Sequence, residues 1–411
     1  MHHHAPAPSV ASTPAVPLDL VVVGGGGHVG LPLSLAFAQA GLRVGICDTS
    51  QQTLDTIAEG RMPFREVGAP ELLVQMLAAG RLEMSTSPSM LRRTANVIVV
   101  IGTPIDEFMY PSMAIFDQVA AQMAPHLKPE ALVVLRSTVY PGTSPYLAAA
   151  LVARGSNVKV AFCPERVTEG NALDELHHLP NIIGADEVET GDRAEALFAR
   201  LGTTAVRTTT CEAELAKLFT NAWRYLRFAI ANQFLVMSHN AGIDHEHVLE
   251  AMRTGYSRAA DVPSPGFAAG PCLLKDTMQL AALAADHFAL GHAAVQANEG
   301  MPAFVVGVLQ RRYGALQGRT VGVLGMSFKP ESDDIRSSLS YKLRKLLTWT
   351  GATVLCTDPY VNDPRLVPVE RVLAEADILV LGVPHRTYLE LDLTGREVVD
   401  IWGVLGQGVR V

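Results

Sequence analysis

Cys272 stands at the predicted start of a helix, directly after the turn-forming segment 266–271. A helix N-terminus and a nearby cation lower the pKa of a thiol from about 8.5 to roughly 3.5–7.5, so we expect a reactive thiolate here. Asp276 follows four residues later and shares a helical face with the sulfur, where its carboxylate would orient or deprotonate a water. Taken alone, a cysteine is more often a buried, inert thiol.

Lys217 and Asn221 form a second candidate pair, spaced i and i+4 on a long predicted helix. An ammonium and an amide that converge on one oxygen stabilise a developing alkoxide or oxyanion. The alternative interpretation is a surface lysine beside a helix asparagine, because both residue types are usually exposed.

A glycine-rich turn follows the first apolar run of the chain. Gly25, Gly27 and Gly30 satisfy the pattern G-x-G-x-x-G, with a predicted strand before it and a predicted helix after it. Such glycines allow a tight turn, a close approach of the backbone to a pyrophosphate and close packing of helix on strand. The N–H groups at the helix start then face the anion. We therefore expect His28 and Val29, within this turn, to lie against a dinucleotide.

Asp48 ends the next predicted strand, 18 residues beyond Gly30. An acidic residue at this position accepts hydrogen bonds from a ribose diol and repels a 2′-phosphate, so the pattern favours NAD over NADP. A flexible glycine turn with a solvated Asp48 is the alternative.

The elements that must position these residues follow from the apolar periodicity. Up to about residue 207, short apolar runs alternate with helical stretches, which predicts a parallel sheet covered by helices on both faces. Strands are expected at 18–24, 42–47, 97–101, 131–135 and 158–162.

The next hundred residues are almost free of strand signals, and the alternation returns near residue 320. Helices are expected at 211–240, 245–254, 272–285 and 293–312. The last part predicts strands at 320–324, 353–356, 378–381 and 397–400, with a helix at 341–350.

The predicted fold is therefore α/β: two Rossmann-like parallel-sheet domains joined by a central helical domain with one long helix. Residues 1–17 are His-, Ala- and Pro-rich and are expected to be a disordered lead or tag. The three domains are predicted at 18–207, 208–312 and 313–411.

Composition excludes several classes of protein. Apolar residues make up 48% of the 411 residues, which is incompatible with intrinsic disorder. A net charge of −8 argues against nucleic acid or an anionic membrane as the main partner. The five cysteines contain no C-x-x-C pair, so neither a disulfide framework nor a structural zinc is expected, and no metal ion is predicted. No apolar run is long enough to span a bilayer, and a cytoplasmic location is expected.

Several segments past residue 130 together resemble the UDP-glucose/GDP-mannose dehydrogenase family, and they occur in the order typical of that family. They are Arg136-Ser137-Thr138-Val139 with Pro141-Gly142-Thr143, Pro164-Glu165-Arg166 with Glu169-Gly170, Glu214-Leu215-Ala216-Lys217 with Asn221, Gly270-Pro271-Cys272-Leu273-Leu274-Lys275-Asp276, and Ser327-Phe328-Lys329-Pro330 with Asp333-Asp334-Ile335-Arg336. The resemblance extends from about residue 18 to the C-terminus.

The resemblance implies an NAD-dependent enzyme, usually a homodimer, that oxidises C6 of a nucleotide-linked sugar from alcohol to carboxylate. An aldehyde has no alkoxide from which a second hydride can leave, so a thiolate must first add to form a thiohemiacetal and then a thioester. The implied catalytic residues are Cys272, Lys217, Asn221, Asp276, Thr138 and Glu165. The implied substrate contacts are Glu169, Lys275, Lys329, Asp334 and Arg336, while Gly102, Thr103 and Thr138 would border the cofactor.

UDP-glucose, oxidised to UDP-glucuronate, is the simplest substrate, and UDP-N-acetylglucosamine, UDP-N-acetylmannosamine and GDP-mannose remain open. The sequence departs from the family at Ala269, at Ser337-Ser338 and in the segment 105–111, which weakens any inference about the sugar. A two-electron dehydrogenase of the hydroxyacid type would need neither Cys272 nor a C-terminal α/β domain. A non-catalytic nucleotide-binding protein is a further alternative. Such a protein would not need Cys272, Lys217, Asn221 and Asp276 together.

Overall fold

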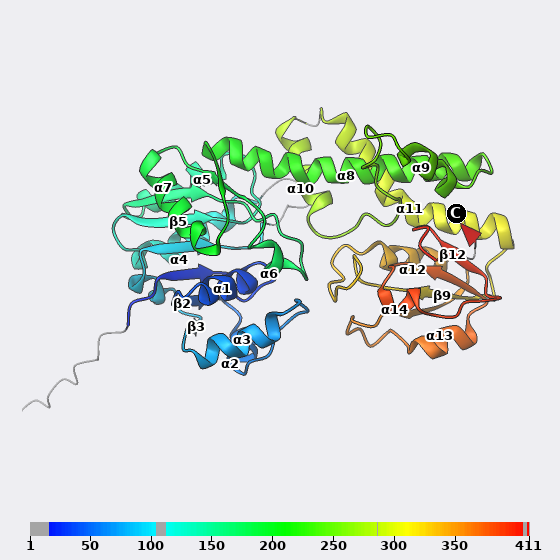
Figure 1. Cartoon of the computed structure of the whole chain (residues 1–411), viewed down its shortest axis with the longest axis horizontal. Coiled ribbons are helices and arrows are strands. Elements are labelled where there is room, and N and C mark those ends of the chain that lie inside the picture. Colours follow the sequence, from blue (N-terminus) through cyan, green and yellow to red (C-terminus); the bar gives the residue numbers. More distant parts are fainter. Residues whose placement is uncertain (1–15, 104–111, 286, 406–408, 411) are drawn as a thin grey trace, which may run out of the picture.

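The computed structural model describes residues 16–103, 112–285, 287–405 and 409–410. Two α/β parts lie side by side, and a long helix runs across both of them (Figure 1). This arrangement confirms the predicted fold class. Residues 1–15 of the lead predicted at 1–17, and the family departure at 105–111, lie outside the described residues.

The first part is built on an eight-stranded sheet with the order β3-β2-β1-β4-β5-β6-β7-β8. Every pairing is parallel except β6 with β7, where Phe162 lies opposite Gly184, so the expectation of a purely parallel sheet is wrong at this point. The strands are β1 (Leu20–Val23), β2 (Val44–Cys47), β3 (Leu82–Ser85), β4 (Asn96–Val99), β5 (Ala131–Leu135), β6 (Val158–Phe162), β7 (Asn181–Gly184) and β8 (Ala205–Thr208).

Three of these strands, β3, β7 and β8, were not expected from the sequence. Each has only four residues, and β3 and β8 are edge strands whose side chains are partly or fully exposed. An edge strand needs no continuous apolar run, because only one of its sides is paired and its faces are partly hydrated.

Helices cover both faces of this sheet, as alternate residues of β5 show. Val133 packs in a cluster with Phe116 and Leu147, whereas Leu132 packs with Phe37 from the other layer. The helices of this part are α1 (Gly30–Gln39), α2 (Gln51–Ala58), α3 (Ala69–Ala78), α4 (Ala114–Met123), α5 (Thr143–Val152), α6 (Ala172–Glu175) and α7 (Val188–Phe198), with short 3-10 turns at Pro88–Arg93, Ala124–His126 and Ala199–Leu201.

The central part is helical, as expected: α8 (Thr210–Asn240), α9 (His245–Arg253), α10 (Leu273–Leu283) and α11 (Ala289–Tyr313). A capping box between Thr209 and Glu212 starts α8. Buried Glu214 then accepts N–H bonds from Gly142 at 2.6 Å and Ser144 at 2.8 Å, which fixes α8 to the start of α5.

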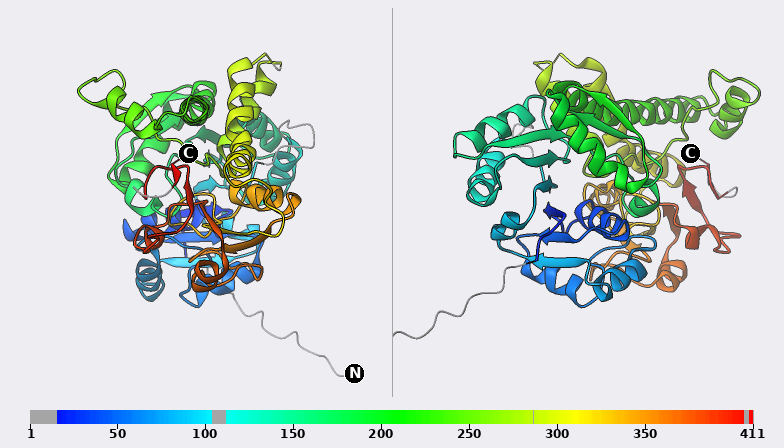
Figure 2. Two further views of the ribbon diagram at one scale, coloured as in Figure 1. Left: turned by 90° about the vertical axis from the view of Figure 1, so that its right-hand side faces the viewer. Right: turned by 60° about the vertical axis from the view of Figure 1, so that its left-hand side comes forward.

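The second sheet has the order β10-β9-β11-β12-β13, and all its pairings are parallel. Its strands are β9 (Thr320–Leu324), β10 (Thr353–Thr357), β11 (Ile378–Leu381), β12 (Val398–Asp400) and β13 (Val409–Arg410), and its helices are α12 (Leu339–Trp349), α13 (Val369–Glu375) and α14 (Arg386–Leu389). One core cluster joins this sheet to α11 and α12, so the central helices are packed directly on the second part (Figure 2). Among the described residues, no helix has both the length and the apolar character needed to cross a bilayer.

Candidate active site

In the glycine turn between β1 and α1 the surrounding chain leaves no room for a Cβ at Gly24, Gly25, Gly26 or Gly30, whereas Gly27 is open. Gly24 has φ +76°, and a Cβ there would lie 1.8 Å from the carbonyl oxygen of Val100. A Cβ on Gly30 would lie 2.4 Å from the carbonyl oxygen of Gly24. At Gly27 the nearest atom would be 3.9 Å away, so the backbone is free to approach a ligand. The turn therefore fits a pyrophosphate above the start of α1.

Asp48 closes the other side of this turn, at the end of β2. Its carboxylate accepts the N–H of Gly26 at 2.9 Å and that of Ser50 at 3.0 Å, while the side chain stays half-buried. Asp48 thus holds the glycine turn against β2 and keeps exposed surface for a ribose diol. Val29 caps α1, and the ring of His28 stacks on Phe64 with the centroids 4.1 Å apart.

Cys272 is the N-cap residue of α10, so its predicted place at a helix start is confirmed. Its side chain is exposed, yet protein surrounds it on most sides, and this desolvation raises the pKa of the thiol. Asp276 and Glu169 raise the pKa further, against the opposing effect of Lys275 and Lys217. The expectation of a lowered pKa is therefore wrong, because desolvation of the thiol, together with two nearby carboxylates, outweighs the two amines.

Asp276 is fully buried one turn into α10 and contacts two of the other predicted residues, Asn221 and Lys275. Its Oδ2 accepts a hydrogen bond from Nδ2 of Asn221 at 2.5 Å, and its Oδ1 lies 3.0 Å from Nζ of Lys275. Asn221 therefore contacts Asp276 here, whereas the sequence suggested that it converges with Lys217 on one oxygen. The contact fixes α10 and its cysteine against α8.

Lys217 is 9% exposed and lies on the same helix as Asn221. Burial lowers the pKa of its amine, and the negative fields of Asp276, Cys272 and Glu165 oppose this shift. An amine that is buried and still faces two carboxylates and a thiol is suited to hold or release a proton near the sulfur.

A chain of contacts extends from α10 to the first sheet. Nζ of Lys275 donates to Oγ1 of Thr103 at 3.0 Å, and that hydroxyl donates to the carbonyl oxygen of Thr138 at 2.7 Å. Gly102 is exposed beside them, and Thr138 is half-buried. These residues follow β4 and β5, so they lie at the carboxyl ends of parallel strands, where ligands bind in such sheets.

Glu165 is occupied by contacts within the protein. Its carboxylate pairs with buried Arg136 at 2.7 Å and accepts the N–H groups of Arg166 at 2.7 Å and Val167 at 3.1 Å. Both oxygens are therefore engaged within the protein, and the role that the resemblance implies for Glu165, to hold a water or assist proton transfer near C6, stays a prediction. Sequence reasoning quoted Arg136 in a motif but did not recognise it as the partner of Glu165.

The second α/β part meets the first around Glu169. Arg336 lies 3.2 Å from Oε1 of Glu169 and 2.5 Å from Oδ2 of Asp334, and the amine of Lys329 donates to the carbonyl oxygen of Glu169. His28, Glu169 and Asp334 bring their nitrogen and oxygen atoms within 4.8 Å of one another. The glycine turn, the loop after β6 and the loop after β9 thus converge.

Burial raises the pKa of Glu169 to about 7, helped by the nearby charge of Asp334 and opposed by Arg336. The pKa of His28 is lowered, mainly by burial and secondly by Arg336. Burial therefore shifts both groups toward their uncharged forms relative to the free side chains.

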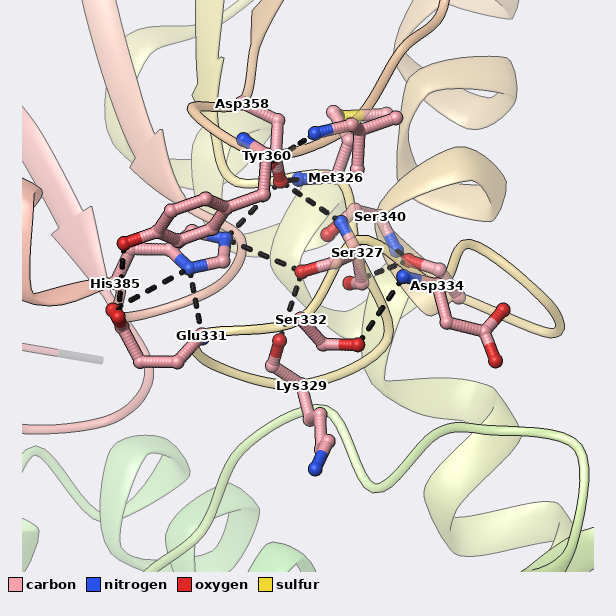
Figure 3. Close-up of polar contacts among 12 residues, drawn as sticks. Met326, Ser327, Lys329, Glu331, Ser332, Asp334, Ser340, Asp358, Tyr360 and His385 are labelled. Atoms are coloured by element: carbon pink, nitrogen blue, oxygen red, sulfur yellow. Dashed lines mark hydrogen bonds and ion pairs between the residues drawn. The ribbon is translucent and has the colours of Figure 1, made fainter. Parts of the chain in front are cut away.

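A buried histidine network that the sequence did not reveal supports the loop after β9 (Figure 3). Nε2 of His385 lies 3.1 Å from Asp358 and 3.2 Å from the hydroxyl of Ser327, while Nδ1 accepts the N–H of Glu331. Because Ser327 and Asp358 meet the same ring nitrogen, this is not a relay for a nucleophilic serine. A signal did exist, since Asp358 follows β10 just as Asp48 follows β2.

The glycine turn, Asp48 and the two Rossmann-like sheets together define a dinucleotide-dependent dehydrogenase with an exposed thiol at the start of α10. Three models of the UDP-glucose/GDP-mannose dehydrogenase family match the chain: its NAD binding domain at 19–202, its central domain at 211–300 and its UDP binding domain at 322–407. The chain belongs to the UDP-glucose/GDP-mannose dehydrogenase family, and NAD is its cofactor.

Relatives that are named for different sugar substrates have nearly the same sequence identity to this chain. It is 27% identical to the UDP-N-acetyl-D-mannosamine dehydrogenase of Pyrococcus horikoshii, over 95% of this chain and 93% of that one. It is 28% identical to a UDP-glucose 6-dehydrogenase of Bacillus subtilis, over 87% of this chain and 84% of that one. Its fold is similar to the structure of a UDP-glucose dehydrogenase from Pyrobaculum islandicum, with a TM-score of 0.88, 27% identity and 96% coverage of both chains.

Asp48→Asn should relax the choice of dinucleotide. The amide still accepts the N–H of Gly26, but it no longer repels a 2′-phosphate, so we expect the NADP⁺/NAD⁺ ratio of kcat/KM to rise about tenfold or more, roughly 1.4 kcal/mol. Steady-state kinetics with both dinucleotides measures this. Asp55→Asn, at an exposed position on α2, is the control and should leave the ratio unchanged.

Proposed function

We propose that this chain is an NAD-dependent nucleotide-sugar 6-dehydrogenase that converts the C6 hydroxyl of a UDP-sugar to a carboxylate, with UDP-glucose as substrate and UDP-glucuronate as product. One observation carries the proposal. An exposed thiol caps α10, and Lys217, Lys275, Asp276 and Glu169 all act on its pKa. No other described cysteine has such a set of charged neighbours.

NAD⁺, held at the glycine turn and Asp48, would supply the hydride acceptor for each of the two oxidations at C6. After the first, the thiol of Cys272 adds to the aldehyde and passes its proton to a neighbouring base, which forms a thiohemiacetal. After the second, the sulfur holds a thioester, and water releases the carboxylate and restores the thiol. Each turnover therefore consumes one alcohol, one water and two NAD⁺, and yields one carboxylate, two NADH and three protons.

The buried amine of Lys217 suits the proton transfers at C6, because burial already lowers its pKa. Asn221 and Asp276 hold α10 in place and bring a carboxylate close to the thioester for the hydrolytic water. Thr138 lies beside Thr103 on the side of the predicted cofactor contacts, and Glu165 acts on the pKa of Lys217. Lys329, Asp334 and Arg336 would bind the nucleotide part of the substrate, since a guanidinium pairs with a diphosphate through two bonds.

A UDP-N-acetylhexosamine is the second candidate substrate, favoured by the relative from Pyrococcus horikoshii, whose name states UDP-N-acetyl-D-mannosamine. NADH release should be measured on UDP-glucose, UDP-N-acetylglucosamine, UDP-N-acetylmannosamine and GDP-mannose. Two NADH per sugar consumed would support the four-electron scheme. One NADH with free aldehyde would instead support a two-electron dehydrogenase, and tight binding of NAD⁺ and UDP-sugars without turnover would support a non-catalytic protein.

On this proposal the domains are 18–207 for NAD, 208–312 for dimerisation and 313–411 for the UDP-sugar. One face of α8 carries the exposed apolar residues that a dimer would cover: Phe219, Trp223, Ile230, Phe234 and Met237, between 36% and 62% exposed. Their spacing of three, four and seven residues places them on a single stripe. A second copy of this chain is the proposed occupant.

Trp223→Glu should convert the dimer to a monomer, because it places a charge in the middle of the apolar stripe. Light scattering coupled to size-exclusion chromatography measures the mass. Trp349→Glu changes another exposed tryptophan, on α12, and should leave the mass unchanged. A wild-type protein that elutes as a monomer would contradict the proposed homodimer.

Glu169 should make the stability of the protein depend on pH. Its pKa rises from 4.5 to about 7 in the folded chain, so the native state keeps the proton over a range where the unfolded chain has lost it. Stability from this group therefore falls as pH rises from about 4.5 to 7. In Glu169→Gln that slope disappears. The difference in melting temperature between this variant and the wild type should therefore grow, in favour of the variant, by about 2–4 °C from pH 5 to pH 8. Thermal unfolding checks this, with Glu71→Gln on an exposed position as control.

A further inference from the structure

Three consecutive residues between α2 and α3, Phe64, Arg65 and Glu66, each contact a different part of the site. None of them belongs to a motif that the sequence revealed. Phe64 stacks on His28 in the glycine turn, with an angle of 20° between the rings. Phe64 thus contacts the glycine turn, on the side of the site where NAD would bind.

Glu66 holds the loop that carries Glu169. It is 4% exposed, and its carboxylate accepts the N–H groups of Gly170 at 2.9 Å and Ala172 at 2.6 Å. The N–H of Leu173 donates to the same carboxylate at 3.4 Å. A fourth hydrogen bond runs from the N–H of Val67 to the carbonyl oxygen of Gly170 at 3.1 Å. The loop after β6 is therefore tied to the same short segment as the glycine turn.

Arg65 reaches across to the second α/β part. Its backbone N–H donates to Oδ2 of Asp333 at 3.0 Å, its guanidinium lies 3.3 Å from Oε2 of Glu331, and the guanidinium carbon lies 3.9 Å above the ring of Tyr360. Three contacts from one residue thus join the two parts. Asp333 and Glu331 stand on the same loop as Lys329, Asp334 and Arg336.

Glu331 is held in place by contacts that do not involve Arg65. Its φ of +57° is in the left-handed region, which is strained for a residue with a side chain. Its N–H donates to Nδ1 of fully buried His385 at 3.0 Å, and its carboxylate accepts the hydroxyl of Tyr360 at 2.8 Å (Figure 3). An exposed ion pair is usually worth little because both side chains must be ordered to form it. Here the acceptor is already ordered, so that cost is smaller.

We propose that Phe64-Arg65-Glu66 is a positioning element that couples the dinucleotide site to the nucleotide-sugar site, an inference that rests on the proposed function for the identity of the second ligand. Arg65 fixes the loop 328–336, whose Phe328 lies against Gly270 just before Cys272. Phe64 and Glu66 fix the glycine turn and the loop of Glu169. Occupancy of one site therefore orders the other. By linkage, UDP and NADH must each raise the affinity for the other by the same factor.

Arg65→Ala should raise KM for the nucleotide sugar about tenfold and change kcat less than about threefold, because Arg65 positions the loop and touches no reacting atom. Arg65→Lys should give an intermediate KM, since lysine keeps the charge for Glu331 but loses the planar face over Tyr360. Arg61→Ala is the matched control. Arg61 lies four residues earlier, is exposed, pairs only with Glu59 among the described contacts, and should leave both constants unchanged.

The direct test is the coupling between two probes, measured by titration calorimetry of NADH with and without saturating UDP. We expect UDP to tighten NADH binding at least fivefold in the wild type and in Arg61→Ala, and less than twofold in Arg65→Ala. Equal NADH affinity with and without UDP in the wild type would overturn the inference, as would undiminished coupling in Arg65→Ala. If the wild type binds both probes but oxidises no nucleotide sugar, the proposed function fails, and the calorimetric comparison still decides the role of Arg65.

Discussion

Cys272→Ala should lower carboxylate formation at least about a thousandfold while NADH still binds with wild-type affinity. The second oxidation requires a tetrahedral carbon at C6, and in our scheme only the thiol of Cys272 provides the fourth bond. The first oxidation needs no thiol, so any residual activity should yield one NADH per aldehyde instead of two per carboxylate. Product analysis by mass spectrometry and NADH absorbance, run on the same samples, separate the two outcomes.

Cys211→Ser is the control, because Cys211 is also exposed and lies near the start of α8. It should keep wild-type turnover and stoichiometry. Unchanged carboxylate formation in Cys272→Ala would remove the thioester scheme and favour a two-electron reaction.

Lys217→Ala should reduce kcat about 10²–10³-fold and leave KM for the nucleotide sugar within about threefold. The amine is buried, and Asp276, Cys272 and Glu165 act on its pKa. In the proposed mechanism this amine stabilises the charge that develops on the C6 oxygen, and the substitution removes it. The bound substrate still has its nucleotide contacts on the loop after β9, which is why binding should change little. Steady-state kinetics across a pH series is the measurement.

Lys345→Ala, on an exposed position of α12, is the control for the loss of one positive charge and should behave as the wild type. If Lys217→Ala raised KM in proportion to the fall in kcat/KM and left kcat intact, Lys217 would be a binding residue and its proposed catalytic role would be wrong.

Local chemistry made much of this protein predictable. The glycine turn and Asp48 were recognisable because their spacing is dictated within one strand–turn–helix–strand unit. The long helix, at 211–240 from the sequence and Thr210–Asn240 in the structure, has few helix-breaking residues inside it and a capping box at its start. The strands β9 and β11 match their predicted bounds, because each is a continuous buried apolar run.

Other elements carried no comparable local signal. The strands β3 and β8 are short and partly exposed at the edges of the sheet, so their pairing depends on a neighbouring strand that is distant in the sequence. The antiparallel pairing of β6 with β7 is likewise a property of the assembled sheet.

The amino-acid sequence by itself determined which groups could react: the thiol at a helix start, the lysine and asparagine one turn apart, and the family to which these motifs belong. Only the tertiary structure decided what surrounds them. The raised pKa of Cys272, the pairing of Glu165 with Arg136 and the three contacts of Arg65 with loops of the second α/β part depend on segments distant in the chain. The physical reason is that desolvation and charge–charge interactions depend on distances in space, which a periodic pattern along the chain does not contain.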